Sequence, residues 1–268
     1  MQQPDRLGDA ERTFYDTHGY WIVPGLFGPQ ELAAFDRRFE DLVEGRAAVP
    51  ETMLVMRDVM VAKGAVAPRS RLAAIAKIQN FEDDALLYGD YVCHPRVLDW
   101  VESFVGPDIK SIHTMLINKP PDVDGRHPLH QDLVYFPFRP ADQIVASWTA
   151  IGRCTRENGC LVVLPGSHKG ELMEHGNPDW EWVNYAYFGA KGVGAESNRV
   201  HLEMEPGDTV FFHPLLVHGS GHNATPHFRR SISAHYASSR CRYIAEHPAP
   251  KHPPRYLLVR GRAYDGCI

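Results

Sequence analysis

The spacing of apolar residues changes along the chain, from helical in the first third to strand-like afterwards. Apolar residues recur every three or four positions from Leu32 to Leu42, directly after Pro29, which predicts a helix beginning at this proline. A second apolar face between Val97 and Phe104 predicts another helix, which a Gly-Pro pair then ends. We therefore expect the amino-terminal third to be helical, with short extended pieces between the helices.

Short runs rich in β-branched and aromatic residues dominate the rest of the chain, separated by glycine, proline and Asn/Asp turns. Residues 206–208, Pro-Gly-Asp, are a typical turn between two of these runs. The runs predict strands at residues 144–150, 160–164, 200–204, 209–212 and 231–236.

Many closely spaced short strands after a helical segment favour a mainly β fold, a β-sandwich or jelly roll with flanking helices. A doubly wound α/β fold is the alternative, but no glycine-rich strand-to-helix turn of a nucleotide-binding kind occurs. We expect a single domain over residues 1–268. It comprises helices to about 106, a jelly-roll core over about 107–245, and a proline-rich carboxyl-terminal strap over 246–268.

Composition narrows the functional classes. The net charge of -5 gives no basic excess for nucleic acid, and no apolar run is long enough to predict a membrane span. The first twenty residues lack the apolar stretch of a secretory signal, and no peroxisomal signal is recognised, so we expect a cytoplasmic protein. Five cysteines without a C-x-x-C pair predict neither a disulfide framework nor a zinc ribbon. Fifteen histidines, in contrast, point to metal chemistry.

A His-x-Asp pair is the first candidate for that chemistry. On an extended segment His130 and Asp132 point to the same side and can bind one metal ion together. His218, after a later β-like run, supplies a third ligand, although His213 and His222 lie close enough in sequence to compete for that role. Two histidines and one carboxylate are typical of non-haem iron(II) oxygenases, because this set leaves coordination positions open for a 2-oxo acid and dioxygen.

A 2-oxo acid such as 2-oxoglutarate also needs a cation for its distal carboxylate, and a guanidinium binds a carboxylate through two parallel hydrogen bonds. Arg229 follows His218 by eleven residues, with a predicted turn between them, so it can lie on the next strand of the same cavity. Its neighbour Arg230 would point to the opposite face of that strand and serve the structure.

Five segments in order resemble the phytanoyl-CoA dioxygenase family. They are residues 111–122 (SIHTMLINKPPD), 127–140 (HPLHQDLVYFPFRP), 158–170 (NGCLVVLPGSHKG), 207–223 (GDTVFFHPLLVHGSGHN) and 228–238. The similarity extends over nearly the whole chain, from Phe14-Tyr15 onward. It departs from the family pattern in residues 174–198 and beyond about residue 245.

The resemblance implies a double-stranded β-helix (a cupin-like jelly roll) with iron at His130, Asp132 and His218. It also implies that Arg229 and Ser220 bind 2-oxoglutarate. The matching positions that contact or line the 2-oxoglutarate pocket are Lys77, Met115, Gln131 and Trp148. No catalytic residue beyond the metal site is implied.

The implied activity is an Fe(2+)-, 2-oxoglutarate- and O2-dependent hydroxylation, at the 2-position of a fatty-acyl-CoA such as phytanoyl-CoA. Phosphates of such a substrate would contact Lys and Arg side chains near the cavity mouth. The carboxyl-terminal part offers these at residues 240, 242, 251, 255, 260 and 262. A family hydroxylase acting on a free small molecule, and a non-catalytic cupin-like binding protein, are the alternatives. Halogenation is disfavoured because Asp132 takes the coordination position that a halide would need.

Overall fold

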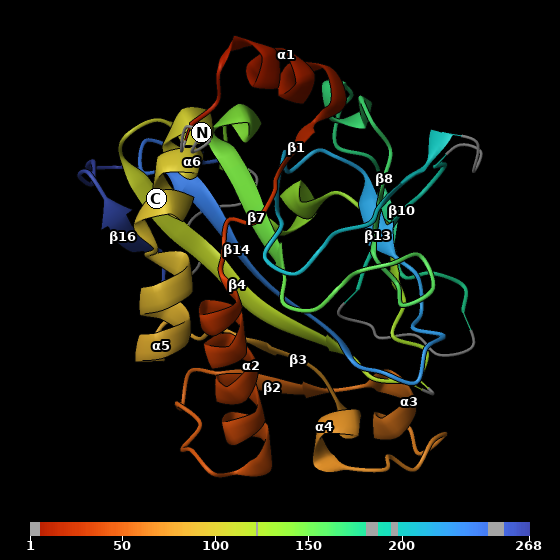
Figure 1. Cartoon of the computed structure of the whole chain (residues 1–268). Coiled ribbons are helices and arrows are strands. Elements are labelled where there is room, and N and C mark those ends of the chain that lie inside the picture. The colour runs from red at the N-terminus through yellow and green to blue at the C-terminus, as the bar shows by residue number, and fades with distance from the viewer. Residues whose placement is uncertain (1–5, 122, 181–186, 194–197, 246–254) are drawn as a thin grey trace.

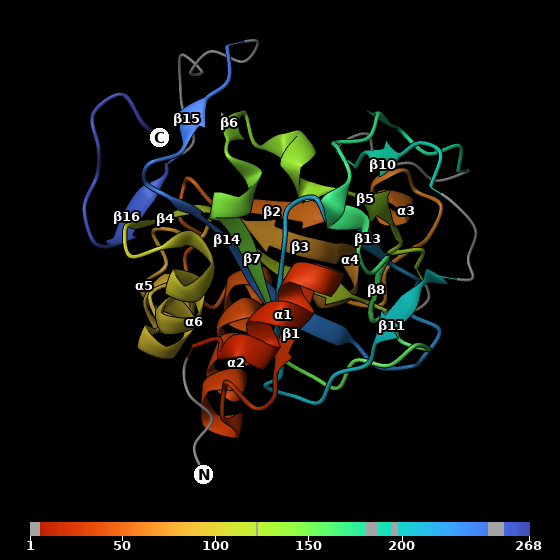
Figure 2. The same ribbon diagram turned by 90° about the horizontal axis from the view of Figure 1, so that it is seen from above.

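The computed structural model describes residues 6–121, 123–180, 187–193, 198–245 and 255–268. Two antiparallel β-sheets face each other, and helices cover the outer face of the larger one (Figures 1 and 2). In the described part of the chain, no helix has the length and apolar character needed to cross a membrane. The prediction of a mainly β jelly roll with flanking helices is confirmed.

The larger sheet has the strand order β1-β12-β7-β14-β4-β3-β2, and β16 pairs with the free part of β4. Its strands are β1 (Tyr20–Val23), β2 (Leu54–Arg57), β3 (Ile75–Gln79), β4 (Ile109–Lys119), β7 (Ile144–Ala150), β12 (Thr209–Phe212), β14 (Arg229–Ser238) and β16 (Leu257–Arg260). Strands from both ends of the chain thus join this sheet, which extends beyond the expected core of residues 107–245. Residues 246–254, the proline-rich part of the expected strap, lie outside the described residues.

The smaller sheet has the order β11-β8-β13-β5. Its strands are β5 (His127–His130), β8 (Leu161–Val163), β11 (Val200–Leu202) and β13 (His218–Ser220). Two short ribbons complete the β-structure: β9 (His175–Gly176) with β10 (Gly189–Ala190), and β6 (Phe138–Arg139) with β15 (Arg242–Tyr243).

The two longer helices after the first strand, over residues 29–44 and 95–105, pack their apolar faces against the outer face of the larger sheet. The helices are α1 (Asp9–His18), α2 (Pro29–Glu44), α3 (Val59–Ala62), α4 (Arg71–Ala74), α5 (Ala85–Leu87), the π-helix η1 (Tyr88–Val92) and α6 (Pro95–Val105). Helix α2 begins at Pro29 as predicted and ends at Glu44; Gly45 caps it, with a φ of 75° that suits a residue without a side chain. Its apolar face, including Phe35 and Phe39, is buried with Ile232 and Tyr236 of β14 in one core. A second core fills part of the space between the sheets and includes Trp148 and Phe212.

The predicted strands largely match the observed ones. Strands β7 and β12 have the predicted bounds, whereas β8 and β11 are shorter and β14 is longer. The predicted turn before β12 is present, and Gly207 has a φ of 92°; a Cβ atom at this position would clash with the carbonyl oxygen of Phe27. The longest strand, β4, was not predicted.

Strand β14 lies at the centre of the larger sheet, between β4 and β7. Because its side chains alternate, Arg230, Ile232 and Tyr236 face the helices, while Arg229, Ser233 and His235 line the space between the sheets. This inner face of β14 forms one wall of the candidate site.

Candidate active site

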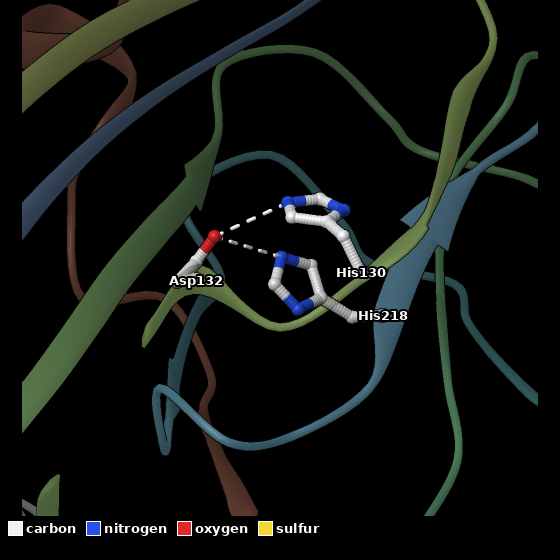
Figure 3. Close-up of side chains that lie close together, drawn as sticks. All are labelled: His130, Asp132 and His218. Atoms are coloured by element: carbon white, nitrogen blue, oxygen red, sulfur yellow. Dashed lines mark ion pairs between the residues drawn. The ribbon is translucent and has the colours of Figure 1, made fainter. Parts of the chain in front are cut away.

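Three potential metal ligands come together where the smaller sheet meets the short 3-10 helix η2 (Asp132–Tyr135). His130 ends β5, His218 begins β13, and the two residues are paired in the register of these strands. The Nε2 atoms of His130 and His218 lie 3.2 and 3.6 Å from Oδ1 of Asp132. Figure 3 shows the three side chains converging on one point, as the His-x-Asp spacing predicted.

Backbone carbonyls orient both imidazole rings. Nδ1 of His130 lies 2.8 Å from the carbonyl oxygen of Pro128, and Nδ1 of His218 lies 2.9 Å from that of Leu216. Nδ1–H therefore donates in each case, which leaves the Nε2 lone pair free and directed at Asp132 Oδ1 and the common point.

The charges of the three groups suit a divalent cation. Burial lowers the pKa of His218 to about 4, so this ring is neutral and able to act as a ligand. Burial alone would raise the pKa of Asp132. The neighbouring imidazoles of His218, His235 and His130 outweigh burial and hold this pKa well below the usual value. Two imidazoles and one carboxylate are a donor set that fits iron(II).

Gly219 explains how β13 can approach β5 so closely. A Cβ atom on Gly219 would lie 2.8 Å from the carbonyl oxygen of His127 and 3.0 Å from that of Pro128. Only glycine fits here without moving backbone, so the glycine of the His-Gly-Ser-Gly segment holds His218 opposite His130.

Arg229 is a buried cation without an acidic partner among the described residues. Its side chain is almost wholly inaccessible, and Nη1 donates to Ser231 Oγ at 2.8 Å. Nε has no hydrogen-bond partner, and the guanidinium carbon lies 5.4 Å from the ring centre of Trp148. Burial lowers the pKa of Arg229, so this cation is held at a cost that an anionic ligand would offset.

A second cation, Lys77 of β3, lies in the same cavity. Its Nζ is 3.9 Å from the sulfur of Met115 and 4.6 Å from the ring centre of Tyr187. Burial lowers the pKa of Lys77 to about 8, against a smaller opposing effect of Asp132. Neither cation has a carboxylate within ion-pair distance among the described residues, and a dianionic ligand would supply the missing charge.

These groups line one cavity of about 590 Å³ between the two sheets. It contains the three metal-ligand candidates and five of the six residues expected to contact 2-oxoglutarate: Arg229, Ser220, Lys77, Met115 and Trp148. The remainder of the wall is largely aromatic and apolar, with Tyr135, Phe136, Phe188 and Tyr256.

Gln131 is the exception and corrects the expectation. It lies between two residues that share a face, so its own side chain points away from the cavity. Its amide donates to the carbonyl oxygens of Leu215 and Glu171 at 2.9 and 3.2 Å and accepts from the Met173 backbone at 2.8 Å. Gln131 therefore ties together loops behind the metal-ligand candidates.

The two histidines that could compete with His218 for the ligand role lie away from the other metal-ligand candidates. His213 packs against His168, with ring centres 5.4 Å apart, and His222 is exposed; neither lines the cavity. His235, which the sequence analysis missed, does line it and lies 2.8 Å from Asp132 Oδ2. Period two along the predicted strand at residues 231–236 could have found it, because His235 shares a face with Arg229.

Comparison with known proteins agrees with this geometry. The family model described as phytanoyl-CoA dioxygenase matches residues 15–231. The chain is 48% identical to a probable phytanoyl-CoA dioxygenase of Caenorhabditis elegans, over 89% of this chain and 78% of that protein. It is also 48% identical to the human peroxisomal phytanoyl-CoA dioxygenase, over 87% of this chain and 69% of that protein.

A similar fold occurs in EctD from S. alaskensis, solved with 2-oxoglutarate and 5-hydroxyectoine. The TM-score is 0.69 at 19% identity, covering 96% of this chain and 88% of that one. Fold and metal-ligand geometry thus define an iron(II)- and 2-oxoglutarate-dependent oxygenase, an enzyme that uses O2. Within that class, the chain belongs to the phytanoyl-CoA dioxygenase family.

Proposed function

We propose that His130, Asp132 and His218 bind iron(II), and that Arg229 and Ser220 bind the distal carboxylate of 2-oxoglutarate. The bound iron supplies activation of dioxygen, coupled to decarboxylation of 2-oxoglutarate to succinate, for hydroxylation of a substrate C–H bond. The observation that carries this proposal is the buried Arg229, which lacks an acidic partner among the described residues and shares one cavity with the triad.

The other cavity residues have supporting roles. Lys77 adds positive charge for a dianionic co-substrate, and its low pKa reflects the cost of keeping that charge buried without a ligand. Trp148, which is nearly inaccessible, and Met115 form apolar walls that keep water from the co-substrate.

For the substrate we propose a fatty-acyl-CoA, hydroxylated at the carbon next to the thioester. The names of the curated relatives support this class. The apolar part of the cavity supports it as well, because Phe136, Phe188 and Tyr256 suit an alkyl chain better than a polar metabolite.

One structural observation favours a substrate without CoA. Most cations expected to meet the phosphates are engaged within the protein: Arg255 contacts Asp83 at 2.6 Å, and Arg260 contacts Asp99 at 2.7 Å. Arg240 and Arg262 both donate to the Tyr264 hydroxyl. Arg242 is exposed on β15, and Lys251 lies outside the described residues. A family hydroxylase acting on a free acid or another small molecule is therefore the second candidate.

The deciding experiment measures succinate released from 2-oxoglutarate with iron(II), using phytanoyl-CoA, an unbranched acyl-CoA and the corresponding free acids. Mass spectrometry of the product locates the added oxygen. We expect turnover of the CoA esters only, with oxygen at carbon 2 and a Michaelis constant that rises with salt. Equal turnover of ester and free acid, without a salt effect, would establish the second candidate instead.

The same proposal includes the compartment. Cytoplasmic location stays a prediction from the sequence, whereas the human relative is named peroxisomal. Imaging a fluorescent fusion of the full-length protein would distinguish the two.

A further inference from the structure

A third histidine lies beside the metal-ligand candidates without being one of them. His235 of β14 is buried, and its Nε2 lies 2.8 Å from Oδ2 of Asp132. Its ring packs against those of Phe136 and His113, with centres 5.2 and 5.6 Å away. These contacts fix the ring in one place against the carboxylate.

The two oxygens of Asp132 consequently have different partners. Oδ1 faces Nε2 of His130 and of His218 at 3.2 and 3.6 Å, whereas Oδ2 faces His235. Among the described residues, the group whose ligand atoms all lie within 4.8 Å of one another contains His130, Asp132 and His218 but not His235. His235 is thus placed to hold the carboxylate rather than the metal.

The difference matters because a carboxylate can bind a metal through one oxygen or through both. A second Asp132 oxygen on the metal would occupy a position that the co-substrate or dioxygen needs. A hydrogen bond from Nε2–H of His235 keeps Oδ2 engaged and directs only Oδ1 toward the metal.

We infer that His235 is a positioning residue that keeps Asp132 a one-oxygen ligand and so preserves the open coordination positions. This inference rests on the proposed metal site. It also assigns a role to the imidazole on the inner face of β14, which lies opposite His113 in the register with β4.

The test compares His235→Leu, which removes the donor, with His235→Gln, whose amide can donate from nearly the same place. Affinity for manganese(II) is measured by titration without 2-oxoglutarate. The visible charge-transfer absorption of the anaerobic iron(II) and 2-oxoglutarate complex is then recorded. We expect His235→Leu to bind metal about 10- to 100-fold more weakly and to shift the absorption, because loss of such a partner has this effect. His235→Gln should recover most of both.

His213→Gln is the matched control, because His213 is another buried histidine, lies outside the cavity and should leave both readouts unchanged. Should His235→Leu fail to fold, His235→Asn takes its place in the comparison. The asparagine side chain is polar but shorter, so its amide does not reach Oδ2 of Asp132.

Parental metal affinity and absorption in a folded His235→Leu protein would overturn the inference. So would a His235→Gln variant as defective as His235→Leu, because that result would make the imidazole itself a ligand. The His130→Ala variant distinguishes a failure of the proposed metal site from a failure of the proposed role of His235. If it retains metal, the proposed site is wrong; if it loses metal while His235→Leu does not, only the role of His235 is wrong.

Discussion

Replacing Arg229 with alanine should weaken 2-oxoglutarate binding far more than it disturbs the fold. The guanidinium lies almost wholly buried above Trp148 and meets no carboxylate among the described residues, so its expected partner is the ligand. Removing one member of a buried, hydrogen-bonded charge pair costs about 2–5 kcal/mol. At about 1.4 kcal/mol for each factor of ten, the dissociation constant should rise roughly 30-fold to several thousand-fold.

Calorimetric titration with 2-oxoglutarate under anaerobic conditions, in the presence of manganese(II), measures this dissociation constant without turnover. Arg229→Lys keeps the charge but loses the paired hydrogen bonds, so it should fall between the parent and Arg229→Ala.

Arg230→Ala is the control, because Arg230 faces the helices and contacts Asp36 and Glu40 at 2.6 and 2.8 Å. It should lower the melting temperature and leave 2-oxoglutarate affinity within about twofold, since its partners lie outside the cavity. Parental affinity in Arg229→Ala, together with a large loss in Arg230→Ala, would show that the opposite face of β14 binds the co-substrate.

Three further predictions concern the metal, a buried charge and the core. Asp132→Ala should abolish tight manganese(II) binding and coupled succinate release, and a variant equal to the parent in both assays would refute the metal assignment. The pKa of Lys77 is lowered from 10.5 to about 8, so the buried charge destabilises the ligand-free protein below pH 8 and ceases to do so as pH approaches 10.5. Lys77→Met should therefore be more stable than the parent by roughly 3 kcal/mol near pH 7, with the difference in unfolding free energy shrinking toward high pH. Urea unfolding at several pH values measures this difference, and a difference that does not change with pH would contradict the reasoning. The hydroxyl of Tyr91 contacts Ser147, Thr149 and the Ile232 carbonyl at 3.0–3.1 Å, so Tyr91→Phe should cost about 1–3 kcal/mol in unfolding free energy but leave 2-oxoglutarate affinity unchanged.

Local patterns predicted those parts of the fold that have a polar and an apolar side. Helix α2 was predicted from its apolar stripe, and β7 and β12 were predicted because turn residues mark their ends. Strand β4 was missed because its run contains lysine, histidine and asparagine, which a local pattern assigns to the surface. These residues are needed inside the protein: Asn118, for example, donates to the Ile75 carbonyl at 2.7 Å.

The site could be predicted where its residues are close in sequence or match a family motif. The spacing of His130 and Asp132 is a local property of extended backbone, and the structure brings His218 to them through strand pairing. Gln131 was misplaced because membership of the motif says nothing about which way its side chain points. His235 was missed because its partner lies 103 residues earlier in the chain, a contact that only the sheet register creates.

Strand β14 sets the spacing between two side chains of the candidate site. One face carries both Arg229 and His235, six residues apart, so a single strand fixes the distance between the proposed 2-oxoglutarate-binding residue and the proposed positioning residue. A one-residue slip would exchange the entire face for Arg230, Ile232, Ala234 and Tyr236 and remove both functions at once. Insertions should accordingly be tolerated in the loop before β14 but not within the strand. In a deep mutational scan of residues 229–236, apolar substitutions should be harmful at one set of alternate positions and polar substitutions at the other set.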